Sequence, residues 1–223
     1  MIDFKGRAGF KTTMEKKHHK VGLKAWVCCD GESYYVTSVD YKASKYDDKG
    51  SGIYEGTRVA MKLLQKSDLL DANRIVVTDN FYTSVQLFSA LRTHKTYGLG
   101  VLKGARVPPG AKFDGARYPR GHHRMMHSRD ANMVVTGWND NRVVYFLSSV
   151  AHEDEAVQRT VLRWSNVDHR RLEVHCPGIV ELYNMFMNGV DVTDQCIEYV
   201  SIEEGRRVHK WWHRVFFHQL DLT

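Results

Sequence analysis

The chain has 223 residues, which is long enough for one domain with a hydrophobic core, or for one domain with an insertion. Hydrophobic residues make up 43% of it and aromatic residues 11%, which excludes a generally disordered chain. The formal net charge of +6 favours an anionic partner, nucleic acid first. No apolar stretch has the length of a bilayer-spanning helix, so we expect no membrane partner.

The four cysteines are Cys28, Cys29, Cys176 and Cys196, and their spacing is not that of a zinc site. Cys28 and Cys29 are adjacent, so on a strand they would point to opposite faces. This pattern favours reduced cysteines in a protein of the cytosol or nucleus.

The first elements expected in chain order are two antiparallel strands, over residues 21–30 and 32–41. Asp30-Gly31 between them is a hairpin signal. Apolar residues spaced four apart then predict an amphipathic helix over residues 58–65.

The stretch RIVVTDNFYTSVQLF at residues 74–88 predicts a strand that ends at Asp79, a short loop and a second helix. Thr83 or Ser84 is the expected N-cap of that helix. A further strand is expected over residues 97–103. The order of strands and helices indicates an α/β fold.

Glycine, proline, arginine and histidine dominate residues 104–129, which predicts a long basic loop or the start of an insertion. A hairpin follows, with strands at residues 133–138 and 142–149. Pro177 is expected in the first turn of a helix that carries the next apolar stripe. A last amphipathic helix is expected in the aromatic segment that ends the chain.

Three aspartates are candidate metal ligands. Asp79 ends a strand, while Asp191 and Asp194 are three residues apart and therefore share one face of a helix. Carboxylates on a strand end and a helix can hold Mg²⁺ ions that act in phosphoryl transfer. From spacing alone a plain alternative stays open, in which Asp79 begins a turn and the other two are solvated helix residues.

Five motifs resemble, in the same order, those of the catalytic domain of piggyBac-type DNA transposases. They are FKGR at residues 4–7, VGLKAWVCCD at 21–30, TDNFYTSVQL at 78–87, YNMFMNGVDVTDQ at 183–195 and HKWWHRVFFHQLDL at 209–222. The resemblance covers nearly the whole chain.

The resemblance implies an RNase H-like α/β fold, with a mixed sheet, flanking helices and a β-rich insertion. Residues 1–103 would form the N-terminal part of the core and residues 104–175 the basic insertion. Residues 176–223 would form the C-terminal helical part. The first strand of the fold would be truncated.

The activity implied by the resemblance is metal-dependent cleavage and transfer of DNA strands. By motif match Asp79 is the second catalytic carboxylate, Asp191 the third and Asp194 an accessory acid. They would bind Mg²⁺ or Mn²⁺ if the protein is active. No zinc module is expected within the chain, which ends at Thr223.

One departure bears on activity. The family's first catalytic aspartate lies six residues before the Phe of its F-[KR]-G-R motif, and Phe4 has three residues before it. Asp3 is five positions from that site, which on a strand means the opposite face and a displacement of about 16 Å. We therefore expect an inactive core fragment or decayed copy. The alternative is a non-catalytic, transposon-derived module that binds nucleic acid or protein.

Basic residues near these motifs are the expected DNA contacts, with a solvated basic face as the plain alternative. They are Lys5, Arg7, Lys103, Arg106, Arg120, Arg124, Arg206, Arg207, Lys210 and Arg214. DNA, at transposon ends or without sequence preference, is the expected partner. We further expect a nuclear location and a homodimer.

Overall fold

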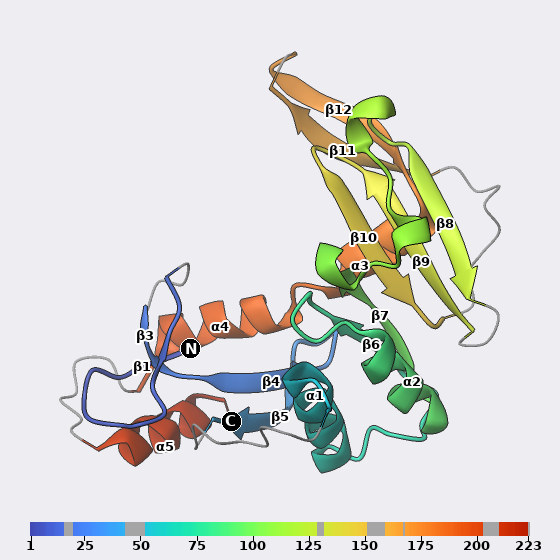
Figure 1. The fold of residues 1–223 in the computed structure, drawn as a ribbon. Coiled ribbons are helices and arrows are strands. Elements are labelled where there is room, and N and C mark those ends of the chain that lie inside the picture. The colour runs from blue at the N-terminus through green and yellow to red at the C-terminus, as the bar shows by residue number, and fades with distance from the viewer. Residues whose placement is uncertain are drawn as a thin grey trace. The chain divides into compact units, whose positions relative to one another are not determined.

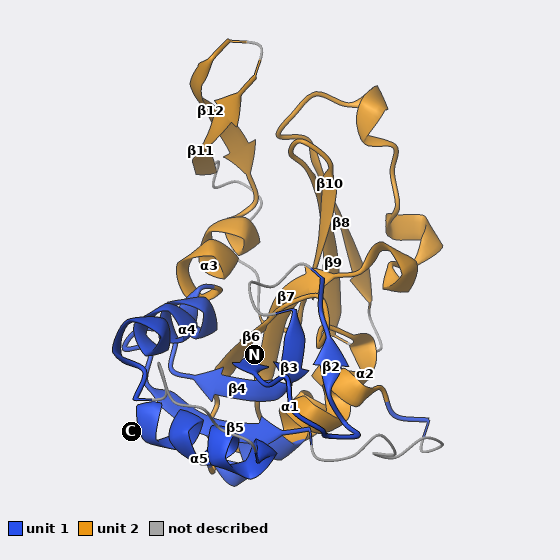
Figure 2. Ribbon diagram, turned by 90° about the vertical axis from the view of Figure 1, so that its left-hand side faces the viewer, with its two compact units in different colours: residues 1–53, 62–67, 188–223 blue, residues 54–61, 68–187 orange. Residues whose placement is uncertain are grey.

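The computed structural model describes residues 1–15, 20–42, 52–128, 132–150, 159–166, 168–202 and 210–222 (Figure 1). Arg206 and Arg207, two of the expected DNA contacts, lie outside these described residues. The chain divides into two compact units (Figure 2). Unit 1 comprises Met1–Ile53, Lys62–Ser67 and Asn188–Thr223, and unit 2 comprises Tyr54–Met61 and Asp68–Met187.

Unit 2 contains a five-stranded mixed sheet with the order β6-β7-β10-β9-β8. Its strands are β6 (Ile75–Thr78), β7 (Tyr97–Leu102), β8 (His123–Ser128), β9 (Met133–Asn139) and β10 (Val143–Ser148). β6 and β7 are parallel, and the other pairs are antiparallel. The β9–β10 pair confirms the hairpin predicted from sequence.

Helix α2 (Val85–Thr93) connects the parallel strands β6 and β7, as a crossover must. Its Leu87, Phe88 and Leu91 are fully buried. Gly98 on β7 lies directly against the Phe88 ring, so any larger residue there would overlap the ring. The close packing of α2 on β7 thus holds the connection from β6 to α2, and Asp79 is the first residue of that connection.

The segment expected to be a long basic loop contains three short 3₁₀ helices and then β8. The helices are η1 (Gly104–Arg106), η2 (Pro109–Ala111) and η3 (Gly115–Arg117). Asn139 at the end of β9 holds this segment, because its side-chain amide donates to the carbonyls of Gly115, Tyr118 and Pro119.

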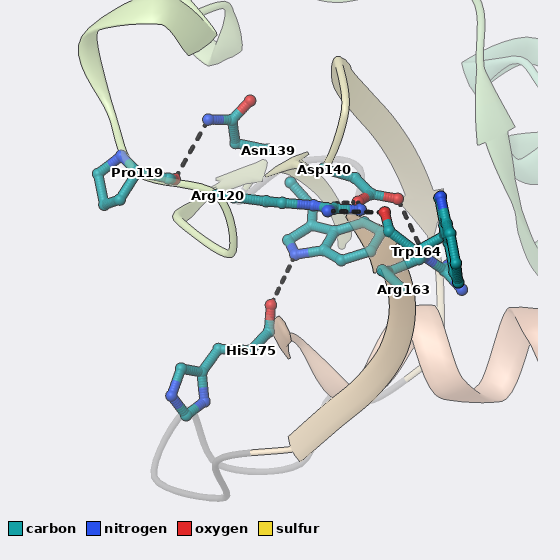
Figure 3. Close-up of polar contacts among 8 residues, drawn as sticks. Pro119, Arg120, Asn139, Asp140, Arg163, Trp164 and His175 are labelled. Atoms are coloured by element: carbon teal, nitrogen blue, oxygen red, sulfur yellow. Dashed lines mark hydrogen bonds and ion pairs between the residues drawn. The ribbon is translucent and has the colours of Figure 1, made fainter. Parts of the chain in front are cut away.

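Strands β11 (Arg159–Ser165) and β12 (Arg170–Cys176) form a separate two-stranded antiparallel sheet. Arg120 and Arg163 both donate to the Asp140 carboxylate, and the Trp138 indole donates to the His175 carbonyl at 2.8 Å (Figure 3). These bonds connect β11 and β12 to Trp138 within β9 and to Arg120 and Asp140, which lie next to β8 and β9 in the chain.

Helix α3 (Gly178–Phe186) follows β12 in unit 2, and helix α4 (Gly189–Val200) follows in unit 1. The helix predicted after Pro177 is thus interrupted at Met187 and Asn188. Ile179 and Val180 of α3 are buried with Leu99, Trp138 and Phe146 in the core of unit 2.

Unit 1 contains a three-stranded sheet, β1 (Ile2–Asp3), β3 (Val21–Leu23) and β2 (Thr12–Thr13), and a pair formed by β4 (Ala25–Cys29) and β5 (Val36–Tyr41). The strand predicted over residues 21–30 is therefore two strands, separated at Lys24. β3 pairs with β1 and β2, whereas β4 pairs with β5.

Two further helices complete the described elements. Helix α5 (Trp211–Asp221) packs against the buried Ile2, Phe4 and Leu23 through Val215. Helix α1 (Glu55–Lys66) has its first residues in unit 2 and its last in unit 1. None of the helices found in the described ranges is both long and apolar enough to cross a membrane.

Candidate functional site

Asp79 directly follows β6 and opens a tight turn. Its Oδ1 atom accepts hydrogen bonds from the backbone amides of Phe81 at 2.9 Å and Tyr82 at 3.4 Å. This is an Asx-type turn, in which the carboxylate replaces a backbone carbonyl. Within the described residues Oδ2 accepts no hydrogen bond, and the side chain is exposed. The carboxylate is therefore oriented by one oxygen and open at the other.

Two buried threonines support the turn. Thr83 donates from Oγ1 to the Asp79 carbonyl at 2.7 Å, and its hydroxyl lies 2.8 Å from that of Thr78. Gly100 on β7 packs directly on both threonines, so a Cβ there would overlap them. The end of β6 is thus fixed by its neighbouring strand.

Ser84 is the N-cap of α2, as one of the two predicted alternatives had it. Its hydroxyl accepts from the Leu87 amide at 3.1 Å and lies 3.2 Å from the Thr57 hydroxyl. The turn after Asp79 therefore leads straight into a capped helix.

Arg106 binds the same turn through its guanidinium. Nη1 donates to the carbonyls of Thr83 at 2.7 Å, Phe81 at 3.3 Å and Asn80 at 3.5 Å. The guanidinium also lies over the Tyr54 ring, 5.2 Å from its centroid. In the sequence Arg106 is only one of several basic residues near the motifs, and no local pattern indicates its contacts with the turn.

Asp191 lies in the first turn of α4, where a carboxylate is favoured by the helix dipole, and Asp194 lies in the second turn. Asp191 is exposed and Asp194 is half-buried. Thr193 between them donates to the Tyr34 carbonyl at 3.1 Å. A Cβ at Gly189 would lie 2.7 Å from Cys29 Sγ, so glycine allows α4 to begin close to the β4–β5 hairpin.

His218 of α5 has a shifted pKa, and the charge of Asp194 is one of the causes. Burial lowers the pKa of His218 from its ordinary 6.5, and the Met1 amino group lowers it further. The negative charges of Asp194 and Asp221 oppose that shift of the pKa. The ring lies 3.1 Å from the Tyr41 hydroxyl, and burial raises the pKa of Tyr41 to about 12.

The three acids are divided between the two units: Asp79 belongs to unit 2, and Asp191 and Asp194 belong to unit 1. Within either unit, over the described ranges, no three His, Cys, Asp or Glu side chains gather as a metal-binding group. The donor type nevertheless fits Mg²⁺ or Mn²⁺, because all three supply hard carboxylate oxygens. The unbonded Oδ2 of Asp79 fits a metal ligand in particular.

The other basic residues differ in their surroundings. Arg120 donates to Asp140 from Nε at 2.8 Å and Nη2 at 2.6 Å, which engages it within the protein. Arg214 is half-buried in α5. Five are exposed: Lys5, Arg7, Lys103, Arg124 and Lys210.

The five-stranded mixed sheet, with α2 crossing between its parallel strands, is that of an α/β domain. The family model described as Transposase IS4 matches residues 1–223, and the chain belongs to this family. Within it, the chain is of the piggyBac type, as the following relatives show.

Human piggyBac transposable element-derived protein 3 is 27% identical over 223 residues, covering 95% of this chain and 36% of the relative. Human piggyBac transposable element-derived protein 2 is 24% identical over 218 residues, with the same shares. The chain thus spans little more than a third of these curated relatives.

A solved structure shares the fold. It is a cryo-EM structure of a piggyBac transposase synaptic complex with hairpin DNA. The similarity has a TM-score of 0.80 at 20% identity and covers 98% of this chain and 42% of that chain. This confirms the predicted RNase H-like α/β fold.

Proposed function

We propose that this piggyBac-type domain supplies the carboxylates of a divalent-metal site for cleavage and transfer of DNA strands. The observation that carries the proposal is the Asp79 turn, in which two amides bind Oδ1 and leave Oδ2 open. Transposases of this family generally depend on divalent metals, which agrees with the donor set. A transposase in complex with DNA has the same fold, which supports DNA as the substrate.

In this proposal Asp79, Asp191 and Asp194 would hold Mg²⁺ or Mn²⁺. The bound metal would activate the attacking oxygen and stabilise the leaving oxygen of a phosphodiester. The chain's own contribution is orientation. The amides of Phe81 and Tyr82 fix the Asp79 carboxylate before a ligand arrives, so little ordering is needed on binding.

Metal binding is tested first. We expect the 223-residue chain to bind Mn²⁺ and the Asp79→Asn variant to bind it at least about tenfold more weakly. Electron paramagnetic resonance of Mn²⁺ measures both affinities. Asp68→Asn is the matched control, because Asp68 is an exposed aspartate of the same unit. Equal Mn²⁺ affinity for Asp79→Asn and the parent chain would refute the metal role of Asp79.

For the polypeptide of residues 1–223 alone, we propose that strand cleavage does not occur. By motif match it carries the second and third acids and the accessory acid, while Asp3 of β1 is five positions from the site that the motif gives to the first. Incubation with transposon-end DNA and Mg²⁺ or Mn²⁺ should therefore leave the strands intact. Cleavage that disappears in Asp79→Ala would overturn this part of the proposal.

A second candidate function is a nucleic-acid-binding module without catalysis, located in the nucleus. The net charge of +6 and the exposed Lys5, Arg7, Lys103, Arg124 and Lys210 favour it. Such binding should weaken steeply as salt rises, because phosphate contacts release counterions. A fluorescence titration with duplex DNA at several salt concentrations tests this, and salt-independent binding would count against it.

A further inference from the structure

Arg106 contacts the residues that follow Asp79 through one nitrogen atom. Nη1 lies 2.7 Å from the Thr83 carbonyl, 3.3 Å from that of Phe81 and 3.5 Å from that of Asn80. Nη1 carries two hydrogens, so the bond to Thr83 uses one and the two longer contacts share the other. The guanidinium is thus bound to the turn itself.

The position of the guanidinium is fixed from a second direction. It lies over the ring of Tyr54, 5.2 Å from the centroid, which favours a cation over an aromatic face. The Tyr54 backbone amide in turn donates to the Gln86 side chain on α2 at 2.9 Å. The Arg106 guanidinium is therefore held between the Tyr54 ring on one side and the carbonyls of the turn on the other.

Lys103 provides an internal comparison, since it is basic and only three residues away. Its ammonium lies 5.9 Å from the centroid of the Phe81 ring, and the side chain is exposed. In the described part of the chain it donates no hydrogen bond to the turn. Arg106 thus binds the turn that follows Asp79, whereas Lys103 lies only near the ring of Phe81.

We propose that Arg106 is a positioning residue for Asp79. By binding the carbonyls of the turn, it keeps the amides of Phe81 and Tyr82 where they donate to Oδ1 of the carboxylate. Oδ2 then stays available to a metal ion. The geometry is independent of the proposed function, but its consequence for metal binding rests on that function.

The test measures amide hydrogen exchange by NMR on the whole 223-residue chain. In Arg106→Gln we expect the Phe81 and Tyr82 amides to exchange about tenfold faster, because charged hydrogen bonds to the turn are lost. The rates should approach those of Asp79→Ala, in which these amides have lost their acceptor. Amides of the β7–β10 ladder should be unchanged, which separates a local effect from unfolding.

Two variants of similar chemistry sharpen the test. Lys103→Gln removes a neighbouring charge and should exchange like the parent chain. Arg106→Lys keeps the charge but has no planar guanidinium to lie over the Tyr54 ring, so its ammonium is not held against the turn and the variant should resemble Arg106→Gln. Parent-like exchange at Phe81 and Tyr82 in either Arg106 variant would overturn the proposal.

Mn²⁺ affinity then links the turn to the metal. Arg106→Gln should weaken Mn²⁺ binding by about tenfold, as other supporting residues of metal ligands do. Faster exchange with unchanged Mn²⁺ affinity would reduce Arg106 to a purely structural role and overturn the positioning claim. If the parent chain binds no Mn²⁺, the proposed function fails, and the exchange rates alone decide whether Arg106 holds the Asp79 carboxylate.

Discussion

Gly100 shows how one missing side chain places a candidate ligand. On β7 it packs on the hydroxyls of Thr78 and Thr83, the two residues whose hydrogen bonds support the Asp79 turn. Any side chain at position 100 has to push these hydroxyls away, and both are buried. The requirement for glycine here is steric, since the backbone must approach closely.

Gly100→Ala should therefore lower the free energy of unfolding by about 1–3 kcal/mol, because the methyl group overpacks a closed site. Urea denaturation followed by circular dichroism measures this. Gly104→Ala is the control, because a Cβ at Gly104 meets no atom within 4 Å. That variant should stay within about 1 kcal/mol of the parent. Equal stability of Gly100→Ala and the parent chain would contradict the steric argument.

At this scale the sequence predicts local chemistry well and tertiary partners poorly. Asp79 at a strand end and the cap at Ser84 follow from residue types within a few positions. The contacts of Arg106 with the Asp79 turn, and of Gly189 with Cys29, join residues far apart in sequence. Such contacts leave no periodicity to detect, so these supporting residues were missed.

At the scale of the elements, one predicted strand is divided in the structure at the point where its two halves pair with different strands. The apolar run of residues 21–30 indicates one strand, yet β3 and β4 join different sheets and separate at Lys24. The predicted strand at residue 32 begins at Val36. Asp30 accepts from the Ser33 amide at 2.8 Å, and Tyr34 has a φ of 62°, so a turn occupies those residues.

The β11–β12 pair depends on a carboxylate that lies outside it. Asp140 accepts from Arg120 on one side and from Arg163 of β11 on the other, and its side chain is 15% exposed (Figure 3). Asp140→Ala should lower the free energy of unfolding by about 2–3 kcal/mol, because two charged hydrogen-bond donors lose their acceptor. Thermal and urea unfolding of the variant check this value.

The control for Asp140 is an exposed ion pair of the same unit. Arg117 and Asp114 have side chains 80% and 57% exposed, so Arg117→Ala should cost about 0–1 kcal/mol. Amide exchange should rise in β11 and β12 for Asp140→Ala and not for Arg117→Ala. The reverse order of the two costs would show that Asp140 does not hold the pair.

For the whole molecule, His218 makes stability depend on pH. Its pKa is lowered by burial, so between the lowered value and 6.5 the unfolded chain binds more protons than the folded one. The contribution to stability is complete above pH 6.5 and is lost as pH falls through the folded pKa. Among the residues that the structure describes, the charged or titrating neighbours of the ring are Met1, Tyr41, Asp194 and Asp221.

Urea midpoints measured between pH 7.5 and pH 5 (about one unit or more either side of 6.5) test this dependence. Stability should fall with pH more steeply in the parent chain than in His218→Gln, which cannot take up a proton. His213→Gln on the same helix is a control for loss of an imidazole. Parallel curves for the parent chain and His218→Gln would exclude His218 as the group responsible.

The pairing of distant segments in unit 1 has a consequence for synthesis. Tyr41 bonds to His218, and Phe10 packs edge-on against Trp211 with centroids 5.1 Å apart. A ribosome adds about 5–20 residues per second, so the first strands wait many seconds for these partners. During that interval the apolar faces of β1 and β3 have no α5 to cover them. We therefore expect the nascent chain to expose these apolar faces until α5 has been synthesised and has left the ribosome.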